Sequence, residues 1–167
     1  EFFERYKGLF LQLKEELDRL VAKDSRVQAE FTAKELDTTN FAKKLLGQIV
    51  FLYFLQKKGW LGVREGATWG AGPKDFLRQL FDRQWMTYDN FFNDILEPLF
   101  YEALAIERDD NLYRKLNARI PFLNGGLFEP MSNYDWQNTD ILIDNGVFAD
   151  IFDTFDLYNF TVREDEP

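Results

Sequence analysis

The hydrophobic residues at the start of the chain recur at steps of three and four positions, which is the spacing of one face of an α-helix. Asp24 and Ser25 interrupt this pattern, and residues 26–37 show no clear period, so we expect a loop with a helical turn there. The chain is therefore predicted to begin with one amphipathic helix. Its apolar positions are Phe2, Phe3, Tyr6, Leu9, Phe10, Leu13, Leu17, Leu20 and Val21.

A second helix is predicted between Thr38–Asn40, whose side chains offer an N-cap, and Gly59, which is a natural C-terminal stop. Its interior, from Leu45 to Leu55, is apolar on nearly all sides. A helix that is apolar all round is buried on all sides. We therefore expect this helix to be the central element of the domain.

Shorter helices separated by loops are predicted beyond Gly59. Residues 60–72 hold four glycines and no periodic pattern, which indicates an irregular loop. Pro73 fits the first turn of a short helix. Thr87 or Asp89 would cap a further helix, in which Pro98 should produce a kink or a division.

The C-terminal part leaves one alternative open. Leu112–Leu116 is expected to form a helical turn or two, and Ile120–Pro130 a structured loop that contains two adjacent glycines. The segment 144–146 (Asp-Asn-Gly) fits a hairpin turn, but the apolar residues from Val147 to Phe155 have helical spacing. We favour the helix, with Asp144 or Asn145 as its cap.

The predicted fold class is mainly α. We expect a single helical domain over residues 1–167, built as an irregular helical bundle around the central buried helix, with a few short strands or turns. The chain begins inside a helical pattern without Met and ends in an acidic stretch, so it is expected to be a fragment of a larger protein.

Composition excludes several kinds of chemistry. Hydrophobic residues make up 46% of the chain and 18 residues are Phe, which supports a packed core. The chain has no Cys and no His, which removes thiol nucleophiles, imidazole bases and Cys/His zinc sites. The longest apolar run, 11 residues, is too short for a membrane span, which needs about 20. With no signal peptide visible, a cytoplasmic protein is expected.

Charge is unevenly distributed. The net charge is −9, of which residues 135–167 contribute −8, from nine acids and one Arg. Residues 38–64 contain five basic residues and no acid. An acidic protein is a poor general DNA binder, because non-specific affinity comes from neutralising phosphates. A local basic stripe on a nearly neutral body would be the exception.

Four lysines are the candidate nucleic-acid contacts: Lys43, Lys44, Lys57 and Lys58. Positions 14 residues apart on a helix return to within about 40° of the same direction and lie about 21 Å apart, so the two pairs would bracket the buried helix on one side. The plainer explanation, which we favour, is that a buried helix needs charged ends at the surface.

No catalytic, cofactor-binding or metal-binding residue is identified. The residue two positions before each of the ten lysines is never acidic, which excludes a common nuclease motif, and no two prolines are adjacent, which excludes the Asn-Pro-Pro-aromatic turn of amino-methyltransferases. The chain also lacks a phosphate-binding Gly-Lys-Ser/Thr loop and a serine nucleophile elbow. Paired carboxylates such as Asp150 and Asp153 could act as acid and base, although a solvated helix face is the favoured interpretation.

Four segments in a fixed order carry a resemblance. They are FAKKLLGQIVFLYFLQKKGWL at 41–61, FFNDILEPLF at 91–100, IPFLNGGLFE at 120–129 and YNFTV at 158–162. This order resembles the region just before the methyltransferase domain in single-chain type II (IIG/IIS-like) restriction–modification enzymes and related adenine-specific DNA methyltransferases. The resemblance covers most of the chain, from about residue 38 to the end.

The resemblance implies a helical region between an N-terminal nuclease and an S-adenosylmethionine-dependent methyltransferase. S-adenosylmethionine, and Mg²⁺ for a nuclease, are implied as cofactors of the parent protein, with none in this segment. DNA and the remaining domains of the same polypeptide are the implied partners, with no membrane. We therefore expect a non-catalytic connector. The alternative is a stand-alone protein-interaction module with an aromatic docking face.

Overall fold

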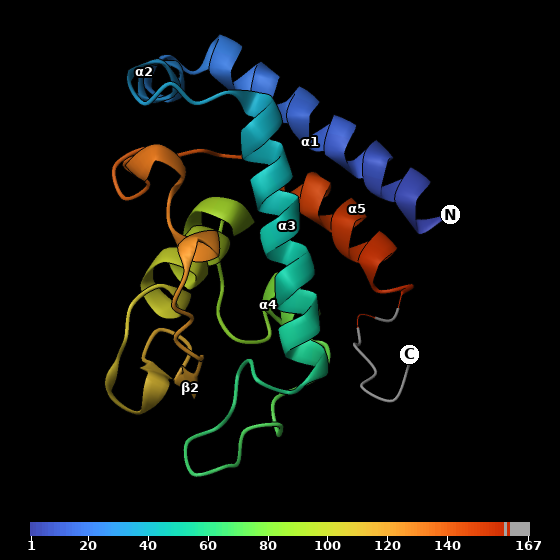
Figure 1. The fold of residues 1–167 in the computed structure, drawn as a ribbon, viewed down its shortest axis with the longest axis vertical. Helices are drawn as coiled ribbons and strands as arrows, with labels where there is room; N and C mark the ends of the chain where they lie inside the picture. Colours follow the sequence, from blue (N-terminus) through green and yellow to red (C-terminus); the bar gives the residue numbers. More distant parts are fainter. Residues whose placement is uncertain (159, 161–167) are drawn as a thin grey trace.

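The computed structural model describes residues 1–158 and 160. Helix α3 (Thr38–Lys57) runs through the middle of the molecule, with α1 (Phe2–Lys23) and α5 (Asn145–Phe155) on one side and residues 91–133 on the other (Figure 1). The prediction of a mainly α fold around a central helix is confirmed. Among the described residues, the sheet is limited to one two-stranded hairpin.

A helix replaces the loop that was expected after Asp24. The prediction was wrong for Ser25–Ala33, which forms α2. Asp24 ends α1 and also caps α2, because its carboxylate accepts hydrogen bonds from the backbone N–H groups of Arg26 (3.0 Å) and Val27 (3.2 Å). Val27 and Phe31 anchor this short helix in the core.

The two ends of α3 are fixed by local hydrogen bonds. Its N-cap is Asp37, not one of residues 38–40 as predicted, because the Asp37 carboxylate accepts a 2.7 Å hydrogen bond from the Asn40 N–H. At the other end Gly59 adopts φ +73°, and the N–H groups of Gly59 and Trp60 bond the carbonyls of Gln56 and Leu55. This is a Schellman motif, and it confirms Gly59 as the stop.

Two further helices pack around α3. Helix α4 (Phe76–Phe81) is short, and Pro73 lies three residues before it rather than in its first turn as predicted. Helix α5 begins after Asp144, whose carboxylate accepts a 2.9 Å hydrogen bond from Gly146 N–H. The helical alternative for Val147–Phe155 is therefore confirmed, and the hairpin alternative is wrong.

The helix that contains Pro98 continues without a break. Two π-helical segments, η1 (Phe92–Leu96) and η2 (Leu99–Leu104), flank Pro98, which keeps helical angles of φ −60° and ψ −37°. The predicted kink is replaced by widened turns, which accommodate a residue that has no N–H to donate. The cap is Asn90, not Thr87 or Asp89, because its side chain accepts a 2.8 Å hydrogen bond from Asn93 N–H.

A small antiparallel hairpin follows. Strand β1 (Leu112–Tyr113) pairs with β2 (Ala118–Arg119), so the helical turn predicted for Leu112–Leu116 is wrong. Beyond it, residues 120–130 form the predicted structured loop, with Gly125 at φ +142°. This part of the chain also contains the 3₁₀ turns η3 (Asp109–Asn111), η4 (Gly126–Phe128) and η5 (Met131–Asn133).

The N-terminal helix and the last described residue meet. The ring of Phe2 lies 5.8 Å from that of Phe160, and Phe160 also packs 5.7 Å from Phe54 on α3. The YNFTV segment at 158–162 therefore reaches the core through its third residue. Its second, fourth and fifth positions, like residues 163–167 of the acidic stretch, lie outside the described residues. None of the described helices has the length and apolar character needed to cross a bilayer.

Candidate nucleic-acid interface

The four candidate lysines lie in two pairs near opposite ends of α3. Lys43 is exposed, but the Lys44 ammonium donates a hydrogen bond to the carbonyl of Glu129 in the 120–130 loop. Burial lowers the pKa of Lys44, and the nearby Glu129 carboxylate opposes this effect. Lys44 therefore serves to hold the loop against α3, which the sequence did not indicate.

The second pair lies beside aromatic side chains. Lys57 is half-buried and Lys58 is exposed, and the Lys58 ammonium lies 5.3 Å from the centre of the Trp60 ring. A cation at this distance from an indole face is attracted by the ring's quadrupole. This end of α3 therefore combines positive charge with an exposed aromatic ring.

An aromatic cleft of about 470 Å³ opens next to Lys58. Its walls are Trp60 and Trp69 from the loop after α3, Pro121 and Phe122 from the 120–130 loop, and two polar residues, Glu107 and Asn111. Trp60 and Trp69 are 39% and 40% exposed, which is unusual for residues of this size. We refer to these six residues as the aromatic cleft.

Glycines close the loop that carries both tryptophans. The N–H groups of Gly70 and Gly72 donate to the carbonyl of Gly59 at 3.1 and 2.9 Å. A Cβ atom on Gly59 would lie 2.2 Å from the carbonyl oxygen of Gly70, so only glycine fits there. The glycines that predicted an irregular loop therefore allow a close backbone crossing.

Arg119 of β2 fixes the far side of the cleft. Its guanidinium carbon lies 4.5 Å from the centre of the Trp69 ring, and one guanidinium nitrogen donates to the carbonyl of Ala67. The backbone of Arg119 also pairs with Val63 through hydrogen bonds of 2.7 and 3.1 Å. Trp69 is therefore held in place by a buried cation rather than left on a free loop.

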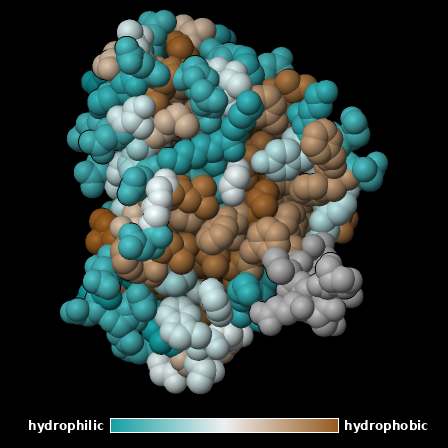
Figure 2. All heavy atoms as spheres, in the orientation of Figure 1, coloured by the Kyte–Doolittle hydropathy of each residue, from teal (hydrophilic) through white to brown (hydrophobic). Residues whose placement is uncertain are grey.

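A second, apolar hollow of about 340 Å³ lies between Phe51 of α3 and residues 122–128. Phe51 and Leu127 are each 38% exposed. Figure 2 shows apolar side chains gathered in a band across the middle of this face of the molecule, where α3 is in front. We call the hollow between Phe51 and residues 122–128 the Phe51 groove. The NGGLF part of the 120–129 segment thus forms one of its walls.

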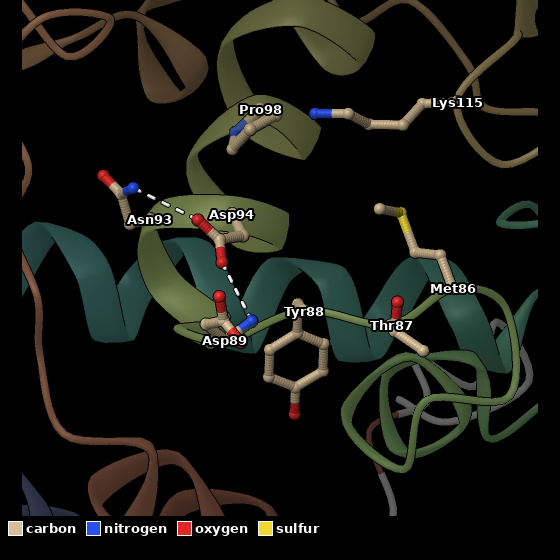
Figure 3. Close-up of a pocket in the computed structure, with 8 residues that line it drawn as sticks. All are labelled: Met86, Thr87, Tyr88, Asp89, Asn93, Asp94, Pro98 and Lys115. Carbon is tan, nitrogen blue, oxygen red and sulfur yellow. Dashed lines mark hydrogen bonds between the residues drawn. The ribbon is translucent and has the colours of Figure 1, made fainter.

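A third hollow, of about 490 Å³, lies beside the start of η1 (Figure 3). Asp94 is its central carboxylate, and it accepts hydrogen bonds from the backbone N–H groups of Asp89 (3.0 Å) and Asn90 (2.9 Å) and from the Asn93 amide (3.2 Å). Burial raises the pKa of Asp94, but these hydrogen bonds outweigh it and leave the pKa below its usual value. Asp94 therefore acts as a structural acceptor for the turn.

The acidic pair considered as a possible acid and base is engaged in structural contacts. Asp150 accepts a 2.7 Å hydrogen bond from Gln12 of α1, and Asp153 forms a 2.8 Å ion pair with Arg78 of α4. Within residues 1–158 and 160, no group of three acidic side chains is placed to hold a metal ion. The structure thus gives these carboxylates a role in joining helices.

Comparison with known proteins links the chain to DNA modification systems. It is 30% identical over 149 residues to a Methanocaldococcus jannaschii protein predicted to be a type II restriction enzyme and methyltransferase. The match covers 84% of this chain but 11% of that protein, so the chain spans about a tenth of its relative's length. No family model matches the chain. No solved structure matches it either. The chain is thus similar to a segment of a restriction–modification protein.

Proposed function

We propose that this chain is the non-catalytic helical connector of a type II restriction–modification enzyme, and that it positions neighbouring domains of the same polypeptide. The observation that carries the proposal is the uncovered Phe51 groove. Its walls are two of the segments that carry the resemblance, α3 and the 120–130 loop. A contact to the DNA backbone through Lys43, Lys57 and Lys58 is the secondary role.

The groove is suited to receive another part of a longer polypeptide. Leaving Phe51 and Leu127 in water is unfavourable, because each Å² of apolar surface that becomes buried stabilises a contact by about 25 cal/mol. A contiguous apolar surface on a soluble protein commonly marks an interaction site. The sequence relationship supports an occupant from the same polypeptide, because the relative extends far beyond the matched tenth of its length.

In this proposal the chemistry belongs to the rest of the enzyme. S-adenosylmethionine would bind in a methyltransferase domain, and Mg²⁺ in a nuclease domain where one is present. The candidate carboxylates of this chain are already used in cap and helix contacts, such as that of Asp153 with Arg78. DNA is the substrate of the whole enzyme, and we expect that enzyme to work in the cytoplasm.

The double change Phe51→Ser and Leu127→Ser tests the connector role within a full-length enzyme that contains this chain. We expect DNA methylation to fall and the junctions between domains to become sensitive to limited proteolysis, because the docked domain loses its apolar contact. Leu11→Ser is the matched control, since Leu11 is an apolar residue of α1 that is already 52% exposed.

Unchanged methylation and unchanged proteolysis of the double variant would contradict the proposal. If the double change instead abolished only self-association of the isolated chain on size exclusion, the groove would serve a separate partner. That result would favour the alternative of a protein-interaction module.

A further inference from the structure

The aromatic cleft has the composition of a site for a flat heterocycle. Two exposed indoles and the ring of Phe122 line a space of about 470 Å³, which is within the range of small-molecule sites. Base–aromatic stacking is the main way in which proteins bind unpaired nucleotides, since every base has a π-face. Trp60 and Trp69 provide such faces at the surface.

Both indoles are presented in fixed positions. Lys58 contacts the Trp60 ring and Arg119 contacts the Trp69 ring, at 5.3 and 4.5 Å from the ring centres. Each indole also borders the cleft. The stacking surfaces are therefore ordered before a ligand arrives, which reduces the entropy that binding must overcome.

The two polar residues of the cleft are hydrogen-bond acceptors for an amino group. The side chains of Glu107 and Asn111 make no hydrogen bond to another side chain or backbone group within the described part of the chain. A carboxylate accepts from the exocyclic amino group of cytosine, and an Asn carboxamide pairs with adenine. Thymine has no amino group to offer them.

The surrounding charges discriminate between ligand classes. Lys58 and Arg119 already lie against the indoles, so an organic cation would meet like charge there. The carboxylate of Glu107 repels a free phosphate in the cleft itself. The Lys58 ammonium lies 5.3 Å from the centre of the Trp60 ring, which borders the cleft, so a phosphate attached to the base could reach Lys58 there.

We propose that the aromatic cleft binds an unstacked, amino-bearing nucleobase of a DNA strand, with the adjoining phosphate on Lys58. This inference rests on the proposed place of the chain in a DNA-modifying enzyme. It adds a base-stacking site to the backbone contact. The site lies in the connector itself.

The experiment measures binding of fluorescein-labelled strands to this chain by fluorescence anisotropy. The probes are oligo(dA), oligo(dT) and an abasic strand of equal length and equal charge. We expect oligo(dA) to bind about 10-fold more tightly than the abasic strand, with oligo(dT) between them, because stacking contributes about 1–3 kcal/mol per base. Trp69→Leu should remove most of the difference between oligo(dA) and the abasic strand.

Two further variants make the result specific. Asn111→Ala should reduce the preference for oligo(dA) over oligo(dT) and leave binding of the abasic strand unchanged. Trp136→Leu, a change at a partly buried tryptophan that does not line the cleft, should leave all three affinities unchanged. Circular dichroism of each variant verifies that the helices are intact.

Equal affinity for oligo(dA) and the abasic strand would overturn the base site. It would leave the proposed connector function untouched, because that function depends on the Phe51 groove. Equal affinity for free deoxyadenosine monophosphate and for oligo(dA) would overturn the assignment of a DNA strand. Displacement of oligo(dA) by millimolar tetramethylammonium at constant ionic strength would show an organic-cation site instead.

Discussion

The hydroxyl group of Tyr134 donates a 2.8 Å hydrogen bond to Oε2 of Glu97, a carboxyl group that has no exposed surface. The other carboxyl oxygen, Oε1, has no hydrogen-bond partner among the described residues. Burial raises the pKa of Glu97 well above its usual value, the bond from Tyr134 lowers it in part, and Asp140 adds to the increase. Glu97 is therefore a source of pH-dependent stability.

The sign of this dependence can be predicted. The pKa of Glu97 is higher in the folded chain than in the unfolded chain, so the folded state binds more protons above the ordinary glutamate pKa of about 4.3. The contribution of Glu97 is fully present below that pH and is lost as pH rises through the folded pKa. The free energy of unfolding can be measured by urea denaturation across this pH range. It should fall less toward high pH in the Glu97→Gln variant than in the parent chain.

The same variant should be more stable than the parent chain at neutral pH, because Gln needs no proton to be neutral whereas the buried Glu97 must bind one. Glu15→Gln, on the exposed face of α1, is the control and should change the free energy of unfolding by less than about 0.5 kcal/mol. A Glu97→Gln variant that parallels the parent chain at every pH would contradict this account.

Two glycines near α3 should respond oppositely to alanine. Gly59→Ala places a Cβ 2.2 Å from the Gly70 carbonyl at φ +73° and should cost more than about 2 kcal/mol of unfolding free energy. Gly47, inside α3, has open space where an alanine methyl group would lie, with no neighbouring atom within 4 Å, so Gly47→Ala should stabilise the chain by about 0.5–1 kcal/mol. Thermal unfolding of the two variants compares them directly, and equal effects would argue against the close crossing.

A polar junction should contribute measurably to holding α3, α4 and α5 together. The hydroxyl of Tyr53 donates a 2.6 Å hydrogen bond to Asp156, whose other oxygen accepts from Arg78 at 3.0 and 3.1 Å. Tyr53→Phe should lower the unfolding free energy by about 1 kcal/mol, because it removes one bond to a carboxylate that keeps its Arg partner. Tyr158→Phe is the matched control, and an equal loss in both variants would contradict the assigned role.

The two lysine pairs should differ in their effect on DNA binding. Lys57→Ala with Lys58→Ala should lower affinity uniformly across sequences and reduce the slope of log affinity against log salt by about 1–2, because each phosphate contact contributes about 0.9. Lys43→Ala with Lys44→Ala should reduce the slope by less, since Lys44 is bonded to the Glu129 carbonyl. Anisotropy titrations from low to moderate salt test this, and an unchanged slope in both pairs would remove the backbone contact.

The elements that could be predicted from the sequence were those with a long or well-capped apolar pattern. Helix α3 was recognisable because its apolar residues point in every direction and Gly59 follows it. Helix α5 was recognisable from the spacing after Asp144. Helix α2 could not be predicted because only two of its nine residues, Val27 and Phe31, are buried, which is too few to define a helical period.

The aromatic cleft could not be predicted because its residues are far apart in the sequence. Trp60, Trp69, Glu107 and Phe122 meet only after the glycine loop closes on Gly59 and Arg119 pairs with Val63. The two-residue strands of the hairpin are also too short to show an alternating pattern. The one available signal was the pair Trp60 and Trp69 in a glycine-rich segment. This segment has no helical spacing, so the two side chains could not be assigned to the buried face of a helix.

The contact between Phe2 and Phe160 has a consequence for how such a module transmits geometry. Phe160 packs against Phe2 of α1 and also against Phe54 of α3, so the three rings form one continuous aromatic contact. Because a close-packed interior transmits displacement, a shift of the first turn of α1 would be felt at the last turn of α3.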